Sequence, residues 1–437
     1  MSGPNPRAAA VAALVRQEQD GFSNLILDAE LRRQKLEGRD KAFASAIFYT
    51  VLEHQGTLDY ILSQFLPKGL AKLDPQVREI LRAALAQARY MQVPASAAVN
   101  EAVKLTRTFK KASASGLVNA VLRRAIGYDL GSAVFADEVE RLMVLGSAGR
   151  DVAAFLHEHY PDEALDILTH TADGGLTSLR ANPLKGTPEA LCEKLLASGA
   201  KTAAPGLVPG SVLARFEGSP AESGLFRDGF FHVEGQASQL AALCVEAKPG
   251  DTVLDLCAAP GGKSFSAAFA MEDKGEIVSC DLHENKLKRI QEGAARLDLT
   301  SITTSAGDGR VFRPEWAERF DTVLVDAPCS GLGIIRKKPD VRYKKADDLF
   351  TLPVIQTALL DNAAQYVAPG GVLVYSTCTI LPEENEQVTD AFLTEHSDFC
   401  RDGFTLPAPV GETEGQLTLW PQRHGTDGFY ICRMTRN

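Results

Sequence analysis

Residues 253–264 read VLDLCAAPGGKS, and this stretch decides the fold expected for the second half of the chain. An apolar strand here runs into small residues and two glycines before a helix, a turn that lets a ligand approach the backbone closely. In a doubly wound parallel sheet, ligands bind at the carboxyl ends of the strands, where such a turn lies. The glycine spacing is neither that of a dinucleotide-binding loop nor that of a P-loop. A tight turn without a ligand is the alternative for this segment by itself.

The sequence on both sides of this turn alternates between strands and helices from about residue 236 onward, which is typical of a parallel-sheet α/β domain. The expected strands are short, apolar and rich in β-branched residues, as in strands that are buried on both faces. They cover residues 252–257, 276–280, 302–305, 321–325 and 372–376, with a last pair near 417–420 and 429–434.

Two of these strands lead to aspartates. Asp281 ends the second strand, and Asp308 follows the third strand in GDGR (307–310). A carboxylate at such a strand end can accept hydrogen bonds from the ribose hydroxyls of a nucleoside. Each aspartate taken alone could instead be the N-cap of a helix. Consecutive strands that each end in a ligand-compatible turn favour the binding site.

Two further strands lead to cysteines. Asp326 and Cys329 follow the fourth strand in DAPCSG (326–331), and Cys378 follows the fifth in STC (376–378). A thiolate is strongly nucleophilic and readily expelled again, which suits attack on an electron-poor ring carbon. A lone cysteine at a strand end would be a buried structural residue, whereas the matched pair favours a chemical role. The spacing leaves Cys329 and Cys378 exchangeable as the nucleophile.

The remaining composition narrows the class of protein. None of the eight cysteines forms a C-x-x-C pair and no histidine cluster accompanies them, so we expect no metal site. No apolar run approaches the roughly 20 residues of a membrane-spanning helix, and no signal peptide is evident. We therefore predict a cytoplasmic protein without disulfides and without membrane contact.

The chain divides into three predicted domains. Residues 1–126 show apolar residues at helical spacing and read as an all-α bundle, residues 127–235 as linker helices plus a small αβ accessory unit, and residues 236–437 as the α/β domain. Helices are expected at 134–145, 152–160 and 163–171, then a strand at 178–182, a helix from Pro188, and turns between Pro205 and Gly218.

Charge is unevenly distributed along the chain. The net charge of −10 separates into +7 for residues 1–126 and −17 for the remainder. A basic first segment on an acidic body suggests contact with a polyanion, although a solvated helical face is the alternative. Six basic residues lie within 21 positions and form a candidate phosphate-binding cluster: Lys104, Arg107, Lys110, Lys111, Arg123 and Arg124.

Several motifs together carry a specific resemblance. CAAPGGK (257–263), DAPCSG (326–331), STC (376–378) with PEENE (382–386), and GTDGFY (425–430) resemble the RNA 5-methylcytosine methyltransferase family. NEAV (100–103) and LVNAVLR (117–123) resemble a NusB-type helical domain. The combination is similar to bacterial enzymes that modify a cytosine of 16S ribosomal RNA.

The resemblance implies a Rossmann-like S-adenosylmethionine-dependent methyltransferase domain preceded by an all-α NusB-like domain and the accessory unit. It implies that Cys378 adds covalently to carbon 6 of the cytosine, that Cys329 assists release of the adduct, and that Asp326 holds and helps to protonate ring nitrogen 3. It assigns S-adenosylmethionine to Cys257, Ala258, Ala259, Pro260, Gly261, Gly262, Lys263, Asp281, Asp308 and Asp326.

The expected partner is 16S ribosomal RNA, free or in an early assembly state, bound by a monomer that does not act on DNA. The basic loop 336–345 and the N-terminal helices would contact RNA phosphates. A methyltransferase for transfer RNA or 23S ribosomal RNA, and a non-catalytic NusB-like RNA-binding factor, are the alternatives. Intact paired cysteines and cofactor acids argue against the non-catalytic factor.

Overall fold

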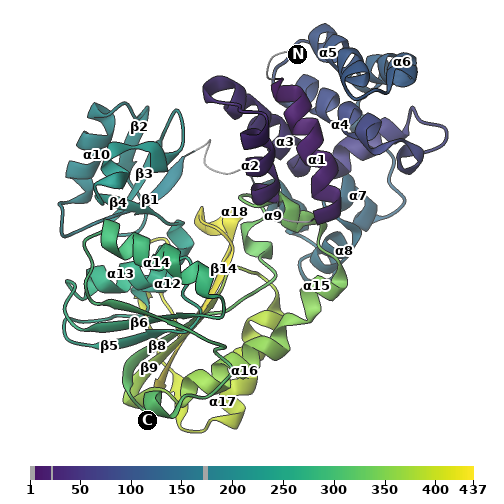
Figure 1. Ribbon diagram of the computed structural model, residues 1–437. Coiled ribbons are helices and arrows are strands. Elements are labelled where there is room, and N and C mark those ends of the chain that lie inside the picture. Colours follow the sequence, from purple (N-terminus) through teal and green to yellow (C-terminus); the bar gives the residue numbers. More distant parts are fainter. Residues whose placement is uncertain (1–4, 21–22, 171–175) are drawn as a thin grey trace. The chain divides into compact units, whose positions relative to one another are not determined.

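The computed structural model describes residues 5–20, 23–170 and 176–437, which form two compact units (Figure 1). Unit 1 comprises residues 1–169 and 335–346, and unit 2 comprises residues 170–334 and 347–437. The segment 127–235 is thus divided between the units, with its linker helices in unit 1 and its accessory αβ elements in unit 2. No helix in the described ranges is both long and apolar enough to cross a bilayer.

Unit 1 is entirely helical, as predicted for its N-terminal part. Its α-helices are α1 (Pro6–Asp20), α2 (Ser23–Arg33), α3 (Gly38–Ser63), α4 (Pro75–Tyr90), α5 (Ala95–Thr108), α6 (Ser115–Ala125), α7 (Glu138–Leu145), α8 (Arg150–His159) and α9 (Ala164–Thr169). Its short 3-10 turns are η1 (Leu70–Lys72), η2 (Ala112–Ala114), η3 (Leu130–Ser132) and η7 (Pro339–Tyr343).

Local chemistry explains where these helices begin. The predicted start of α4 is confirmed, because the Asp74 carboxylate accepts the Gln76 N–H at 3.0 Å and Pro75 occupies the first turn. Helix α7 begins at Glu138 rather than at residue 134, because Asp137 is its N-cap and accepts the Glu140 N–H at 2.7 Å. The predicted helix 163–171 is found as α9, and its last predicted residue, Thr171, lies outside the described residues.

Unit 2 contains an eight-stranded mixed sheet. Its main strands run in the order β10-β14-β9-β8-β5-β6-β7, with β13 paired to β14. Their bounds are β5 (Thr252–Asp255), β6 (Glu276–Asp281), β7 (Ile302–Ala306), β8 (Phe320–Asp326), β9 (Val367–Thr377), β10 (Phe399–Arg401), β13 (Gln416–Leu419) and β14 (Phe429–Arg436). The strands β5 to β9 are parallel, which confirms the predicted α/β class.

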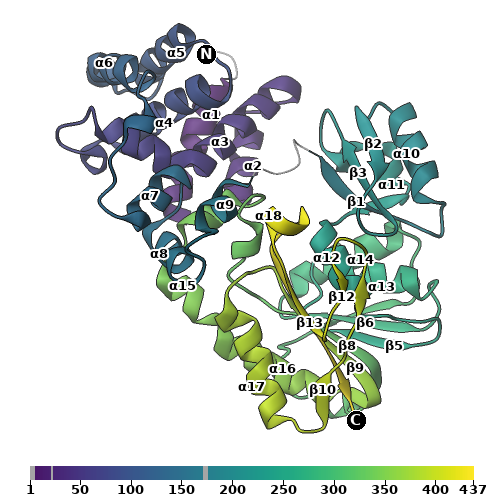
Figure 2. The same ribbon diagram turned by 180° about the vertical axis from the view of Figure 1, so that it is seen from behind.

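Helices cover both faces of this sheet, which is why most residues of its parallel strands β5, β6 and β8 are buried, whereas the edge strand β7 is partly exposed. Figure 2 shows α13 and α14 on one face and α16 and α17 on the other. The helices of this domain are α12 (Gln236–Leu243), α13 (Gly262–Ala270), α14 (Glu284–Arg296), α15 (Ala346–Phe350), α16 (Leu352–Ala364), α17 (Glu386–Glu395) and α18 (Pro421–His424). Smaller elements are η5 (Pro314–Trp316), η6 (Leu332–Ile334), η8 (Pro382–Glu384), β11 (Thr405–Leu406) and β12 (Gly411–Glu412).

The accessory part of unit 2 is a four-stranded antiparallel sheet in the order β2-β3-β1-β4. Its elements are β1 (Thr177–Ala181), α10 (Pro188–Ala197), β2 (Thr202–Pro205), β3 (Ser211–Arg215), η4 (Pro220–Glu222), α11 (Gly224–Arg227) and β4 (Phe231–Val233). The prediction of turns alone between Pro205 and Gly218 is wrong, because β3 lies there. Its Val212 and Ala214 are fully buried, and this packing outweighs the flanking turn residues.

Candidate active site

The strand order brings the predicted site residues into one row along the carboxyl edge of the sheet. Asp326 pairs with Ser376 across β8 and β9, so Cys329 and Cys378 follow neighbouring strands. The next strand, β5, leads into the loop 257–263, and β6 and β7 then end at Asp281 and before Asp308.

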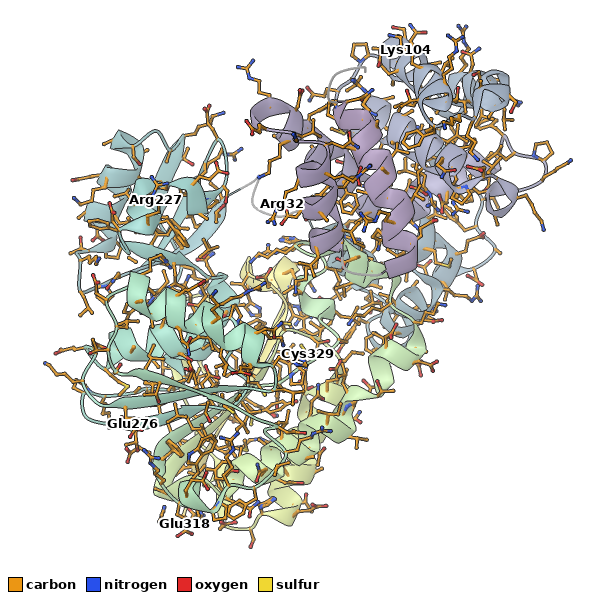
Figure 3. All side chains as sticks on the ribbon, in the orientation of Figure 1. Arg32, Lys104, Arg227, Glu276, Glu318 and Cys329 are labelled. Atoms are coloured by element: carbon orange, nitrogen blue, oxygen red, sulfur yellow. The ribbon has the colours of Figure 1, made fainter. Side chains whose placement is uncertain are left out.

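The two cysteines of this edge are in contact. Cys329 Sγ lies 3.2 Å from Cys378 Sγ, and the Cys378 N–H donates to Cys329 Sγ at 3.3 Å. Both residues are half-buried, and Cys329 is labelled in Figure 3. The hydrogen bond shared with Cys378, together with burial, raises the pKa of the Cys329 thiol well above its usual value. The contact between the two sulfur atoms makes the ionisation of one thiol depend on the other.

Lys263, the last residue of the loop 257–263, forms an ion pair with Asp326, three residues before Cys329. Its ammonium is buried and lies 2.6 Å from Asp326 Oδ2, while the Ser376 hydroxyl donates to Asp326 Oδ1 at 2.8 Å. Burial disfavours the charged form of Lys263, but the Asp326 carboxylate overcomes this effect and raises the pKa of Lys263 above its usual value. Sequence reasoning placed Lys263 only in the cofactor loop and missed this contact with Asp326.

The turn before α13 requires glycine. Gly261 has a φ of 107°, in the left-handed region, and a Cβ there would lie 2.7 Å from the Phe265 ring. Beneath the turn, Asp255 is fully buried and accepts the Ser264 hydroxyl at 2.7 Å. Burial raises the pKa of Asp255 to about 7.

The other end of the row combines carboxylates with exposed apolar side chains. Asp281 Oδ1 accepts the His283 N–H at 3.0 Å and lies 3.5 Å from Lys286 Nζ, so Oδ2 is the atom left for a ligand hydroxyl. Beyond it, Leu282 is 55% exposed and Val311 is 61% exposed. Apolar surface beside a carboxylate fits a nucleoside, whose base is flat and whose ribose carries hydroxyls. Asp308 is already engaged by Arg310, whose Nη2 lies 2.6 Å from Asp308 Oδ2.

A buried carboxylate that the sequence gave no reason to select supports the glycine loop from below. Glu234 follows β4 and accepts hydrogen bonds from His232 Nε2 at 3.0 Å and from the Ser238 and Ser266 hydroxyls at 2.8 Å. These contacts tie the accessory sheet to α13. Burial acts to raise the pKa of Glu234, but the hydrogen bonds from His232 and Ser238 and the charge of Lys263 outweigh it and lower this pKa to about 2.

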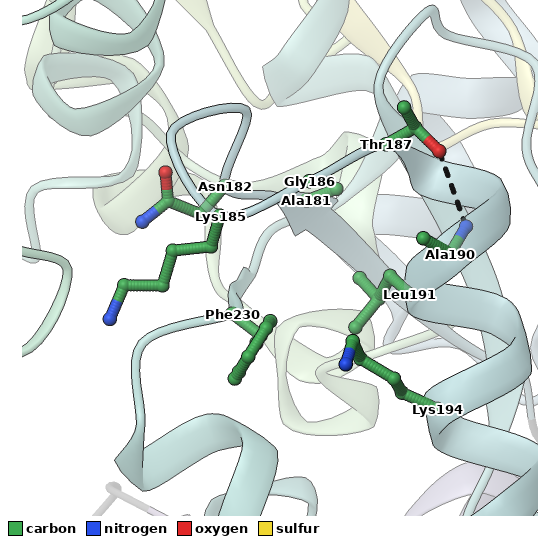
Figure 4. Close-up of a pocket in the computed structure, with 9 residues that line it drawn as sticks. All are labelled: Ala181, Asn182, Lys185, Gly186, Thr187, Ala190, Leu191, Lys194 and Phe230. Atoms are coloured by element: carbon green, nitrogen blue, oxygen red, sulfur yellow. Dashed lines mark hydrogen bonds between the residues drawn. The ribbon is translucent and has the colours of Figure 1, made fainter.

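A separate small pocket lies in the accessory part, between α10 and the half-buried Phe230 (Figure 4). Its Lys185 is bound to the Asp228 carbonyl and lies 2.6 Å from Asp298 Oδ2, so this ammonium stabilises the local fold. None of the predicted site residues lines this pocket.

The residues predicted to contact RNA differ in their exposure and in their ion pairs. Among those of unit 1, Lys104 (labelled in Figure 3) pairs with Glu101, and Lys111 pairs with Asp74. Arg107 and Lys110 are exposed on the same segment.

The prediction that the whole loop 336–345 contacts phosphates is wrong for Arg342. This side chain is only 4% exposed and donates to the Gly146 carbonyl at 2.7 Å inside unit 1. Burial lowers the pKa of Arg342, and the guanidinium stabilises the packing of η7 rather than a surface for RNA.

Comparison with known proteins agrees with this architecture. The family model for the 16S rRNA methyltransferase RsmB/F matches residues 242–435, and the NusB family model matches residues 4–127. The chain is 36% identical to the probable ribosomal RNA small subunit methyltransferase B of Bacillus subtilis, with 100% of each chain covered. It is 33% identical to ribosomal RNA small subunit methyltransferase B of Pseudomonas putida, with 99% and 98% covered.

Solved structures show the same fold. The crystal structure of PH0851 superposes with a TM-score of 0.81 at 27% identity and covers 99% of both chains. A methyltransferase homolog from Pyrococcus horikoshii gives a TM-score of 0.59 at 25% identity, covering 70% of this chain and all of its own. Full-length similarity at this level, on a methyltransferase domain joined to a NusB domain, shows that the chain belongs to the ribosomal RNA small subunit methyltransferase B family.

Proposed function

We propose that this protein methylates carbon 5 of a cytosine in 16S ribosomal RNA, using S-adenosylmethionine and a covalent adduct on Cys378. The observation that carries the proposal is the contact between Cys329 and Cys378 at 3.2 Å, beside the buried Lys263–Asp326 ion pair. Family membership supports ribosomal RNA as the substrate.

The carboxyl edge of the sheet fits the proposed cofactor. Asp281 offers Oδ2 to a ribose hydroxyl, and Asp308 would bind the adenine portion by exchanging its contact with Arg310 for the ligand. Leu282 and Val311 offer apolar surface to an adenine, and the loop 257–263 provides a close backbone approach for the methionine end. When bound there, S-adenosylmethionine supplies an electrophilic methyl group.

Cys378 supplies the activation that cytosine needs. Carbon 5 is a weak nucleophile until a thiolate bonds to carbon 6 and turns the ring into an enamine. With the cofactor bound, carbon 5 would take the methyl group as the sulfonium–methyl bond breaks to leave a neutral thioether, and its proton would then pass to a base. The bond between carbon 6 and sulfur breaks last, and Cys378 leaves as a thiolate. The target base must be unstacked from its neighbours to reach this crevice.

Asp326 and Lys263 balance the charge that develops on the ring. Addition at carbon 6 places electron density on ring nitrogen 3 and its neighbouring carbonyl, and a positioned acid there stabilises it. Lys263 Nζ donates a hydrogen bond to Asp326 Oδ2 at 2.6 Å. The ion pair therefore places a proton donor and a positive charge beside the ring in a site that is shielded from water.

The same electrostatics distinguish the two cysteines. Because the pKa of Cys329 is raised, Cys329 retains its proton next to the sulfur of Cys378. A retained proton suits a residue that assists departure of the Cys378 thiolate, and the assignment of Cys378 as the nucleophile rests on the family resemblance.

Substitution of each cysteine tests this function. With 16S RNA and labelled S-adenosylmethionine, Cys378→Ala is expected to lose methylation and to form no covalent RNA species. Cys329→Ala is expected to accumulate an RNA adduct that survives denaturing electrophoresis. Full activity of Cys378→Ala would refute the mechanism.

A strain that lacks the gene tests the substrate. Bisulfite sequencing of its ribosomal RNA is expected to show one lost 5-methylcytosine in 16S RNA. An unchanged 16S profile with a lost transfer RNA or 23S site would assign the substrate to one of those RNAs instead.

A further inference from the structure

The backbone on both sides of Cys329 is held by two buried side chains from other elements. Gln356, on α16, donates from Nε2 to the carbonyl of Pro328 at 2.9 Å. Glu384, the last residue of η8, accepts the Ser330 N–H on Oε2 at 2.9 Å. The peptide groups directly before and directly after Cys329 are therefore both anchored.

The two anchoring side chains also bind each other. Gln356 Nε2 donates to Glu384 Oε2 at 2.7 Å, and both residues are completely buried. Both partners of Gln356 Nε2 are hydrogen-bond acceptors. They fix the orientation of the Gln356 amide, because the amide oxygen has no hydrogen to donate to them. We call Gln356 and Glu384 together the Cys329 clamp.

A further set of contacts relates the clamped segment to Cys378. The Ser330 hydroxyl lies 2.7 Å from the Thr379 hydroxyl, and the Gly333 N–H donates to the Cys378 carbonyl at 3.0 Å. The segment that follows β8 is thus hydrogen-bonded to the segment that follows β9. With the clamp in place, the backbone that carries the Cys329 side chain is held beside Cys378.

We propose that Gln356 and Glu384 are positioning residues that hold the Cys329 thiol against Cys378 for release of the RNA adduct. This inference rests on the proposed function. Nucleophilic addition depends on Cys378 itself, whereas release depends on the placement of Cys329, so loss of the clamp should separate the two steps. The negative charge of Glu384 also contributes to the raised pKa of Cys329, after the hydrogen bond with Cys378 and burial.

Gln356→Leu tests whether the hydrogen bonds of Gln356 hold Cys329 in place. The leucine side chain is similar in size but makes no hydrogen bonds. We expect methyl transfer in a single turnover to stay near the wild-type rate, and release of the adduct to slow by roughly 10- to 100-fold. The adduct would be measured by denaturing electrophoresis with labelled 16S RNA. Combining Gln356→Leu with Cys329→Ala should add nothing to the adduct that Cys329→Ala alone accumulates.

Gln239→Leu is the matched control. Gln239 is also a buried glutamine whose Nε2 binds backbone carbonyls, those of Leu179 and Glu234, but it lies in α12 and outside the clamp. Both substitutions should lower the melting temperature, and only Gln356→Leu should trap adduct.

Glu384→Gln tests the effect of the Glu384 charge on Cys329, because it removes the charge and keeps the shape of the side chain. It also provides a second variant if Gln356→Leu does not fold. Loss of the carboxylate should lower the pKa of Cys329 and move the pH profile of adduct release to lower pH. The clamp proposal is overturned if the folded variants release adduct at the wild-type rate across the pH profile while Cys329→Ala traps it. If Cys329→Ala traps no adduct either, the proposed function itself fails.

Discussion

Cys329 and Cys378 are 49 positions apart in the chain, yet their sulfur atoms lie 3.2 Å from each other. The contact exists because β8 and β9 are parallel neighbours whose register pairs Asp326 with Ser376. Cys329 lies three residues after the end of β8 and Cys378 directly follows β9, so the edge of the sheet brings both thiols to one point. At this distance the ionisation of one thiol depends on the other.

The first prediction concerns the reactivity of these thiols without RNA. Because the pKa of Cys329 is raised, iodoacetamide at pH 8 should modify Cys378 before Cys329. Peptide mass spectrometry over time would measure both rates, with the exposed Cys400 as an internal reference. Faster modification of Cys329 would contradict the assignment of Cys378 as the nucleophile.

The second prediction concerns the buried ion pair. Lys263→Met leaves the Asp326 carboxylate without its ammonium and should destabilise unit 2 at the low end of the about 3–5 kcal/mol seen for broken buried pairs, because Asp326 is 34% exposed. Methyl transfer should fall by at least about 100-fold. Urea unfolding and single-turnover assays measure the two effects.

The control for this substitution is Lys274→Met, which breaks the exposed pair with Glu272. We expect little change in stability and none in methyl transfer. Equal losses for the two variants would show that the burial of Lys263 has no functional consequence.

The third prediction is a dependence of stability on pH. The pKa of Asp255 is about 7 in the folded protein, against about 3.9 in an unfolded chain. Between these values the folded state binds a proton that the unfolded state has released, so this group lowers stability as pH rises from about 4 to 7. Asp255→Asn cannot ionise, and its melting temperature relative to wild type should increase from pH 5 to pH 7.5.

Asp273→Asn provides the opposite case. Although burial opposes it, hydrogen bonds from Ser301 and Thr300 lower the pKa of Asp273, so its stabilising contribution is complete above about pH 4 and is lost only at lower pH. The melting-temperature difference of this variant should stay constant from pH 5 to pH 7.5. A constant difference for Asp255→Asn as well would show that Asp255 does not titrate in this range.

The fourth prediction concerns RNA binding by unit 1. Arg107→Ala combined with Lys110→Ala should weaken RNA binding and reduce the slope of log Kd against log salt by up to about 2. The exposed Lys248 and Lys274 of unit 2, replaced together by alanine, serve as the control and should leave the slope unchanged. Arg342→Ala should lower stability without a change in slope, since its guanidinium is buried.

Much of the fold follows from local patterns. The period of the apolar residues predicts the helices of unit 1, and runs of β-branched residues predict the parallel strands β5 to β9. The start of α4 follows from Asp74 and Pro75 alone. Strand β3 was missed because turn residues flank it, and its pairing with β1, on the far side of α10 and β2 in the sequence, has no local signal.

The carboxyl-edge residues could also be identified in the sequence, because each is the last residue of a strand or follows one within three positions. Their partners could not. Glu234, Gln356 and Glu384 carry no periodic signal, and each acts through contacts with residues 28 to 54 positions away. The basic residues of 336–345 looked equivalent in the sequence, and only packing inside unit 1 separates Arg342 from the others.

The sequence by itself thus determined the succession of strands along the chain, the residue types at their ends and the resemblance to a methyltransferase family. Each of these depends on neighbours along the chain. Only the tertiary structure decided that Lys263 bonds to Asp326 and that the sulfur atoms of Cys329 and Cys378 are in contact. Burial, charge and hydrogen bonding are set by residues brought together from distant segments, and a thiol acquires its reactivity from those surroundings.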